Sequence, residues 1–141
     1  KDNPVFYVQY AYARCSSVMR NAKEMFPDMD LSVQHLAKAD LSKIDDEDSL
    51  QMVKVLAAWP KMVEAAAEAF EPHRVAFYLN DVASEFHSLW SKGRTNTTLR
   101  FLDETDPEMS KARLALVAGV MTVLASGLSI MGVKPMEEMH G

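Results

Sequence analysis

The chain has a single cysteine, Cys15, so it can form neither an internal disulfide nor a cysteine-based zinc site. Its five glycines and six prolines exclude collagen-like and low-complexity structure. The first ten residues lack the charged and apolar regions of a signal peptide. They also lack a starting Met, so we expect a fragment of a longer chain.

What is present is typical of a folded domain. The chain of 141 residues is 48% hydrophobic and 25% charged. A chain of this length buries about two-thirds of its unfolded surface, which is enough for one core. No internal repeat or domain boundary is visible, so we expect one helical domain over residues 1–141.

The formal net charge of −5 is unevenly distributed. Residues 25–72 carry ten acidic and four basic side chains, whereas residues 1–24 carry four basic and two acidic ones. Because phosphate attraction depends on Lys and Arg, the whole chain is not an evident nucleic-acid binder. Any RNA-binding surface must be local, and the basic first segment is the best candidate.

Proline positions and apolar spacing predict an all-α, antiparallel bundle of about five helices. The predicted helices cover residues 4–25, 45–58, 60–70, 72–90 and 107–131. A short turn is expected within 32–39, a polar loop over 91–105, and a tail after Gly132, the expected C-terminal cap. No segment shows sustained strand alternation.

Residues 114–133 are uncharged over twenty positions, which is long enough to cross a membrane. They include Thr122, Ser126, Ser129 and three glycines, and no aromatic belt flanks them. These features favour a buried central helix in a water-soluble bundle.

No catalytic or metal-binding constellation is evident. The histidines are His35, His73, His87 and His140. None has a partner at the spacing of a helical metal motif, so we interpret each as a surface or cap residue. Cys15 fits a core position, and the acidic run 45–48 fits a solvated helix cap. We therefore expect no catalytic site, metal site or cofactor in this chain.

The first predicted helix has an aromatic face. Tyr7, Tyr10 and Arg14 are three and four residues apart and so share one side of a helix. Tyrosine rings can stack on unpaired bases, and a guanidinium can contact phosphate. The alternative is that these tyrosines pack in the core with their hydroxyls bonded.

Three segments resemble one family. The run DNPVFYVQYAYAR (residues 2–14) resembles the start of the C-terminal anticodon-binding (DALR) domain of bacterial arginyl-tRNA synthetases. The second match begins with EPHR (71–74) and continues to His87. The third comprises ARLALV (112–117), VLASGL (123–128) and a tail ending at Met139. Tyr12 departs from the family, which usually has His there.

The resemblance implies a part in arginine-tRNA ligation. The full cytoplasmic enzyme would use ATP and Mg²⁺ in a catalytic domain whose HIGH-like and KMSKS-like signatures are absent here. This chain would bind the anticodon stem-loop of arginine tRNA and contact its own catalytic domain, but neither DNA nor membrane. The family's tRNA-binding roles map onto Tyr7, Tyr10 and Met139, with Gln9, Arg14 and Arg20 as neighbours.

Two other classes stay open. One is a helical protein–protein interaction module, which would need an exposed apolar patch. The other is the equivalent domain of a different synthetase, such as the cysteinyl or glycyl enzyme. The run from Asn3 to Arg14 favours the arginine enzyme over the cysteinyl and glycyl ones.

Overall fold

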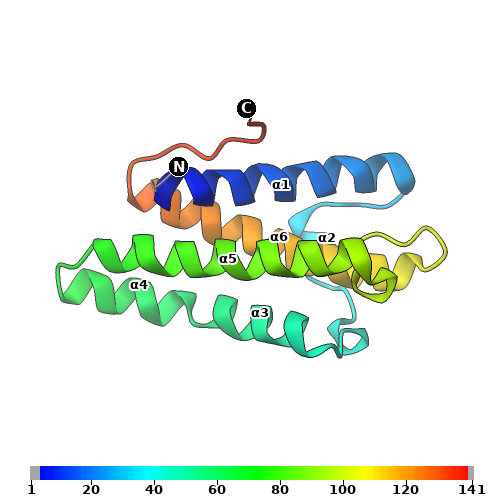
Figure 1. Ribbon diagram of the computed structural model, residues 1–141, viewed down its shortest axis with the longest axis horizontal. Coiled ribbons are helices and arrows are strands. Elements are labelled where there is room, and N and C mark those ends of the chain that lie inside the picture. Colours follow the sequence, from blue (N-terminus) through cyan, green and yellow to red (C-terminus); the bar gives the residue numbers. More distant parts are fainter. Residues whose placement is uncertain (1–3, 140–141) are drawn as a thin grey trace.

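Three long helices form the centre of the structure, a computed structural model that describes residues 4–139. They are α1 (Pro4–Met25), α5 (His73–Thr95) and α6 (Pro107–Ile130). Helices α1 and α5 run in the same direction, and α6 runs antiparallel to both (Figure 1). The expected all-α bundle is confirmed, although α1 and α5 are parallel inside it.

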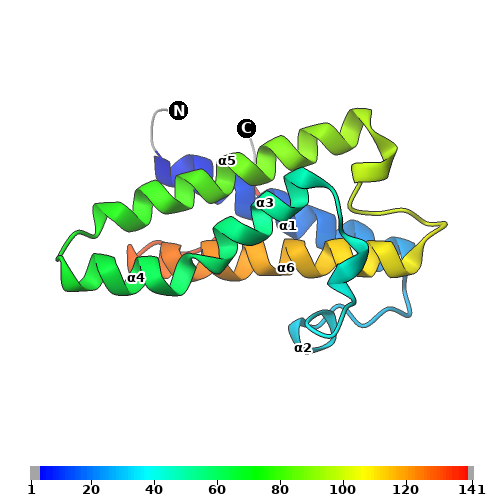
Figure 2. The same ribbon diagram turned by 90° about the horizontal axis from the view of Figure 1, so that it is seen from below.

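Shorter helices complete the bundle. Helices α3 (Glu47–Ala57) and α4 (Trp59–Glu68) follow one another along the side of α5 that faces away from α1 (Figure 1). The short helix α2 (Val33–Leu36) and the 3-10 turn η1 (Leu41–Lys43) connect α1 to α3 and pack against α6 (Figure 2).

Polar caps and prolines set the helix ends where the sequence predicts them. The Asp46 carboxylate accepts a hydrogen bond from the Ser49 amide at 2.9 Å, which caps α3. The Asp106 carboxylate does the same for the Met109 amide at 3.1 Å, and Pro107 occupies the first turn of α6. Gly132 follows α6 with φ +74°, a backbone conformation that favours glycine. Asn3 precedes Pro4 in the sequence, and asparagine is a favoured helix cap, but this residue lies outside the described residues.

The end of α5 differs from expectation. The predicted polar loop 91–105 is wrong over residues 91–95, because α5 continues to Thr95, and the 3-10 turn η2 (Thr97–Leu99) follows. Tertiary contacts stabilise this extra turn. The Lys92 ammonium lies 2.7 Å from the Asp48 carboxylate. Gly93 is buried so closely against the following loop that an added Cβ would lie 3.2 Å from the Leu99 carbonyl oxygen.

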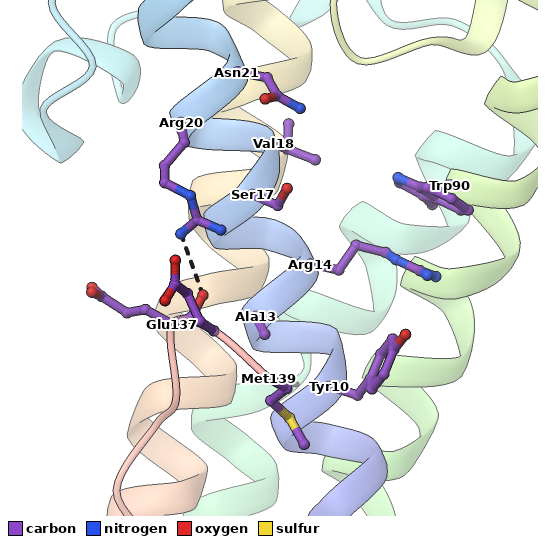
Figure 3. Close-up of a pocket in the computed structure, with 11 residues that line it drawn as sticks. Tyr10, Ala13, Arg14, Ser17, Val18, Arg20, Asn21, Trp90, Glu137 and Met139 are labelled. Carbon is purple, nitrogen blue, oxygen red and sulfur yellow. Dashed lines mark hydrogen bonds between the residues drawn. The ribbon is translucent and has the colours of Figure 1, made fainter. Parts of the chain in front are cut away.

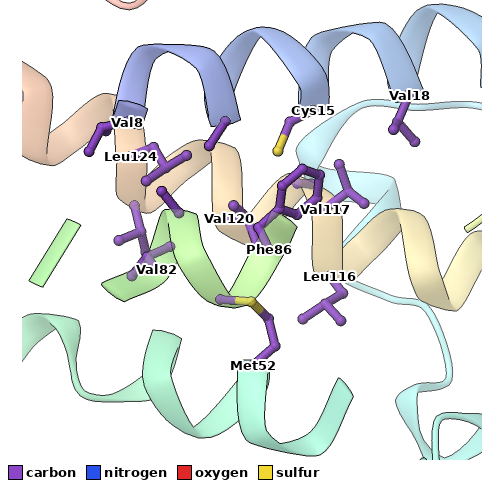
Figure 4. Close-up of a cluster of buried hydrophobic side chains, with 14 of the residues drawn as sticks. Val8, Cys15, Val18, Met52, Val82, Phe86, Leu116, Val117, Val120 and Leu124 are labelled. Carbon is purple, nitrogen blue, oxygen red and sulfur yellow. The ribbon is translucent and has the colours of Figure 1, made fainter. Parts of the chain in front are cut away.

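The core lies where α1, α5, α6 and α3 meet (Figure 4). Its fully buried large side chains include Val8, Met52, Val82, Phe86, Val117, Val120 and Leu124. Gly127 permits close approach of α6 to α5, because an added Cβ would lie 2.5 Å from the Leu79 side chain. Cys15 is also fully buried, as expected for a core position.

Helix α6 is long and apolar enough to cross a membrane, with a mean hydropathy of 1.8 over its most apolar stretch. Half of that stretch is buried within the fold. The helix packs against α1, α5, α2 and α3, in agreement with the expected central position.

A buried arginine joins α6 to two other elements. Arg113 is only 3% exposed. Its Nη1 donates to Ser49 Oγ at 3.1 Å, and its Nη2 donates to Asp46 Oδ1 at 3.2 Å and to the Thr98 carbonyl at 3.0 Å. Burial alone would raise the pKa of Asp46, but the hydrogen bonds from Ser49 and the charge and hydrogen bond of Arg113 outweigh it and lower the pKa.

Replacing Arg113 should destabilise the fold strongly. Arg113→Ala leaves a partly buried carboxylate, a hydroxyl and a carbonyl without their donor, and we expect a loss of about 3–5 kcal/mol of unfolding free energy. Urea denaturation measures this loss. The exposed Arg74→Ala serves as a control and should change the free energy by less than about 1 kcal/mol. Equal effects of both substitutions would contradict the role of Arg113.

Asp46→Asn should give a pH-dependent loss of stability. Asparagine still caps α3, but it lacks the charge that pairs with Arg113. Because the folded state lowers the pKa of Asp46, its stabilisation is full above the unfolded value of about 3.9 and is lost as the pH falls through the folded pKa. The difference between wild type and variant should therefore be largest at neutral pH and shrink below about pH 4. A difference that stays constant from pH 7 to 3 in urea titrations would refute the assignment.

Candidate functional site

A cleft of about 450 Å³ opens between α1, α5 and the C-terminal tail (Figure 3). We call it the tail cleft. Its lining includes Tyr10, Arg14, Arg20, Trp90, Glu137 and Met139. Four of the six residues that the sequence predicted as a binding site are thus brought together: Tyr10, Arg14, Arg20 and Met139.

The periodicity of α1 explains this arrangement. Tyr10, Arg14 and Ser17 are three or four residues apart and lie on the side of α1 that lines the cleft. Val8 and Cys15 project from another side into the core. Burial of that apolar side fixes the rotation of α1, and this rotation directs the polar and aromatic side chains toward the cleft.

Arg14 is the most constrained of the cleft residues. Its guanidinium carbon lies 3.8 Å from the centroid of the Trp90 ring and 5.3 Å from that of Tyr10. These distances are typical of cation–π contacts. Its Nη1 lies 3.0 Å from His87 Nδ1. Because arginine only donates, Nδ1 must accept, and the neutral imidazole then has its proton on Nε2.

His87 supports both tyrosines of the aromatic face. Its ring centroid lies 4.9 Å from that of Tyr7 and 5.9 Å from that of Tyr10. Burial, followed by the charge of Arg14, lowers the pKa of His87 to about 4, so the ring is neutral at pH 7. The expectation of a surface or cap histidine is therefore wrong for His87, because α1 packs over it.

The tail forms the remaining wall of the cleft. After α6 the chain turns back and runs beside α1 (Figure 1). Arg20 Nη1 donates to the Glu137 carbonyl at 3.3 Å, and Met139 lies near Tyr10 (Figure 3). Residues from the two ends of the chain thereby meet in one site.

The structure places the other two predicted residues outside the cleft lining. Tyr7 is exposed and packs on His87 beside the cleft. Gln9 is only 8% exposed, and its Oε1 has no hydrogen-bond partner within the described part of the chain. Gln9 is seven residues from the buried Ser16, so both lie on an inward side of α1.

Sequence reasoning missed Trp90 and His87 as site residues. They are three residues apart, so they lie on one side of α5, the side that faces Arg14. That spacing, together with the place of His87 in the second family match, is a signal that could have found them.

The tail cleft is lined by aromatic, polar and charged side chains. Within residues 4–139, no group of three or more His, Cys, Asp or Glu side chains could hold a metal ion. Burial raises the pKa of the Cys15 thiol well above its usual range, so this group is not a reactive thiolate. The lining offers aromatic rings, a thioether and two guanidiniums, which contact flat rings and anions, beside the carboxylates of Glu137 and Glu138.

Comparisons with known proteins identify the family. The family model described as the DALR anticodon binding domain matches residues 8–139. The arginine–tRNA ligases of Rhodospirillum rubrum and Azorhizobium caulinodans are 58% and 55% identical to the chain over 99% of its length. The chain spans only 24% of each relative.

A solved structure shows the same fold. A Campylobacter jejuni protein assigned as an arginyl-tRNA synthetase superposes with a TM-score of 0.73 at 23% identity. The match covers 97% of this chain and 27% of that one. Given the family match and the relatives' identity, the chain belongs to the DALR anticodon binding domain family.

Proposed function

We propose that this chain is the tRNA-binding domain of an arginyl-tRNA synthetase and that the tail cleft binds the anticodon loop of arginine tRNA. The observation that supports this most is the convergence of Tyr10, Arg14, Trp90 and Met139 on one open cleft. The family match and the ligase relatives point to the same function.

The groups in the cleft suit an unpaired nucleotide. The Tyr10 side chain is 44% exposed and offers a ring on which a base can stack. Met139 adds a polarisable apolar contact beside it. Arg14 has five N–H donors, and its bond to His87 leaves others for a base edge or a phosphate. Tyr7 and Arg20 extend this surface along α1, whereas Gln9 supports it from within.

Arginylation itself belongs to the rest of the longer protein. The relatives are about four times the length of this chain. In such a protein, a separate catalytic domain would use ATP and Mg²⁺ to join arginine to tRNA in the cytoplasm. Within residues 4–139, no group of three or more His, Cys, Asp or Glu side chains could hold the Mg²⁺ ion. This chain would bind the tRNA and contact that domain.

Loss of the Tyr10 ring should remove recognition of the loop. Tyr10→Ala deletes a stacking surface, and we expect affinity for an arginine tRNA transcript to fall by about 5- to 150-fold. A transcript with altered anticodon-loop bases should bind the wild type more weakly, and the variant should bind both transcripts alike. Titration by fluorescence anisotropy measures these affinities.

Phe77→Ala is the matched control for Tyr10→Ala. Phe77 is also an exposed aromatic residue of a long helix, but it does not line the tail cleft. We expect its affinity for both transcripts to match that of the wild type. If the wild type binds both transcripts equally, the proposed recognition of the anticodon loop is wrong.

His87 should position Arg14 through its acceptor. His87→Phe keeps a ring against the tyrosines but removes Nδ1, whereas His87→Asn keeps an acceptor at the same place along the side chain. We expect the Phe variant to bind tRNA more weakly than the wild type at pH 7 and the Asn variant to recover part of the loss. Equal binding by all three proteins would contradict this role.

A stability measurement tests the same contact through its pH dependence. The pKa of His87 is about 4 in the folded chain, against about 6.5 in an unfolded one. The unfolded state therefore takes up a proton between these values, and His87 costs stability as the pH falls from about 6.5 to 4. The unfolding free energy of the wild type, minus that of His87→Phe, should therefore decrease as the pH falls over this range.

A further inference from the structure

A second cleft continues from the tail cleft along the groove between α1 and α5. It has a volume of about 360 Å³, and it shares Val18, Asn21 and Trp90 with the tail cleft. It then extends to Arg94, Arg100 and Phe101 near the α5–α6 loop. We call it the arginine cleft. The shared residues make the two clefts one continuous groove.

The arginine cleft combines an apolar floor with a cationic rim. Val18 and Phe101 are buried beneath it, whereas Arg94 and Arg100 are exposed. The Arg94 guanidinium carbon lies 5.1 Å from the centroid of the Trp90 ring. Within the described part of the chain, neither arginine lies in an ion pair with a carboxylate. Asp103, in the same loop, accepts hydrogen bonds from Thr105, and these bonds, followed by the charge of Arg100, lower the pKa of its carboxyl.

The backbone brings the two arginines together. Arg94 is on the last turn of α5, and Arg100 follows the η2 turn. Gly93 lets this loop fold tightly against α5, because an added Cβ would lie 3.3 Å from the Arg100 Cα. Arg100 Nε donates to the Gly93 carbonyl at 3.2 Å, which orients its guanidinium at the cleft. The Arg100 guanidinium is therefore held in position by the backbone without a ligand.

We propose that the arginine cleft binds a further nucleotide of the same RNA, with its phosphate contacted by Arg94 and Arg100 and its ring or ribose against the apolar floor. This inference rests on the proposed function of the tail cleft. An apolar surface edged by unpaired guanidiniums matches the two parts of a nucleotide. Along α1, Tyr10 and Asn21 are about 16 Å apart at 1.5 Å per residue, so the groove has room for more than one nucleotide.

The test compares charge-matched double variants of the chain. Arg94→Gln with Arg100→Gln removes the two cations of the arginine cleft. Lys54→Gln with Lys61→Gln removes two exposed cations from α3 and α4, on the far side of α5. Both proteins are titrated with the arginine tRNA transcript and its altered-loop partner at several salt concentrations. Circular dichroism and urea unfolding check that each variant is folded.

We expect the arginine double variant to bind about tenfold more weakly than the wild type. The slope of the logarithm of the association constant against the logarithm of the salt concentration should become less steep by about 0.7 for each lost phosphate contact. The preference for the native loop should persist, because the tail cleft is intact. The lysine double variant should behave as the wild type does. An unchanged affinity and salt slope in the arginine double variant would overturn the proposal.

Single-residue and single-phosphate changes localise the contact. Arg100→Gln alone leaves the Arg94–Trp90 contact in place and should still weaken binding, which separates lost phosphate contact from a disturbed Trp90. Ethylation of RNA phosphates one at a time should identify a phosphate whose modification weakens the wild type but not the double variant. If no such phosphate exists, the arginine cleft does not contact the backbone.

The outcomes separate this inference from the proposed function. The arginine double variant could keep the wild-type salt slope while Tyr10→Ala still loses the loop preference. That result would overturn only the proposed role of the arginine cleft. A wild type with no loop preference overturns the function proposed for the tail cleft. In that case, a flattened slope in the arginine double variant would still support a phosphate site at Arg94 and Arg100.

Discussion

The buried guanidinium of Arg113 is the contact on which the geometry at one end of the bundle depends. A charge that is only 3% exposed needs close polar partners, and Arg113 donates to three groups from two other elements, the start of α3 and η2, while its Nε has no partner within the described residues. Ser49 and Asp46 fix the start of α3, and the Thr98 carbonyl fixes η2. Because η2 in turn packs on Gly93, the same contact determines where the last turn of α5 ends.

The tail cleft depends on how the chain returns on itself. Helices α1 and α5 run parallel, so a residue on one can face a residue at a similar height on the other, as Arg14 faces His87 and Trp90. The antiparallel α6 then ends near the start of α1, and the tail has only to turn back to place Met139 beside Tyr10 (Figure 3). Three segments far apart in sequence thus form one surface.

Much of this was predictable from the sequence, and the remainder depends on contacts between distant residues. Prolines and acidic caps act locally, so they located the helix starts, and helical spacing placed Tyr10 with Arg14. The same spacing could have set Gln9 apart, because it lies on another side of α1. The extension of α5 past Trp90 was not predictable, since it follows from the Lys92–Asp48 pair and the close packing of Gly93. The partnership of His87 with Arg14 likewise needs two helices in register.

One wall of the tail cleft is residues 133–139, which lie outside the helices, and this separates the cost of opening the cleft from the stability of the bundle. Arg20 holds the tail through one exposed hydrogen bond to the Glu137 carbonyl. Such a segment can detach in a local fluctuation while the helices stay packed. A ligand that binds between α1 and the tail must then offset the conformational entropy that the tail loses on binding. This cost lowers the observed affinity. The dissociation rate of a bound loop would therefore be set by the release of the tail and not by the unfolding of any helix.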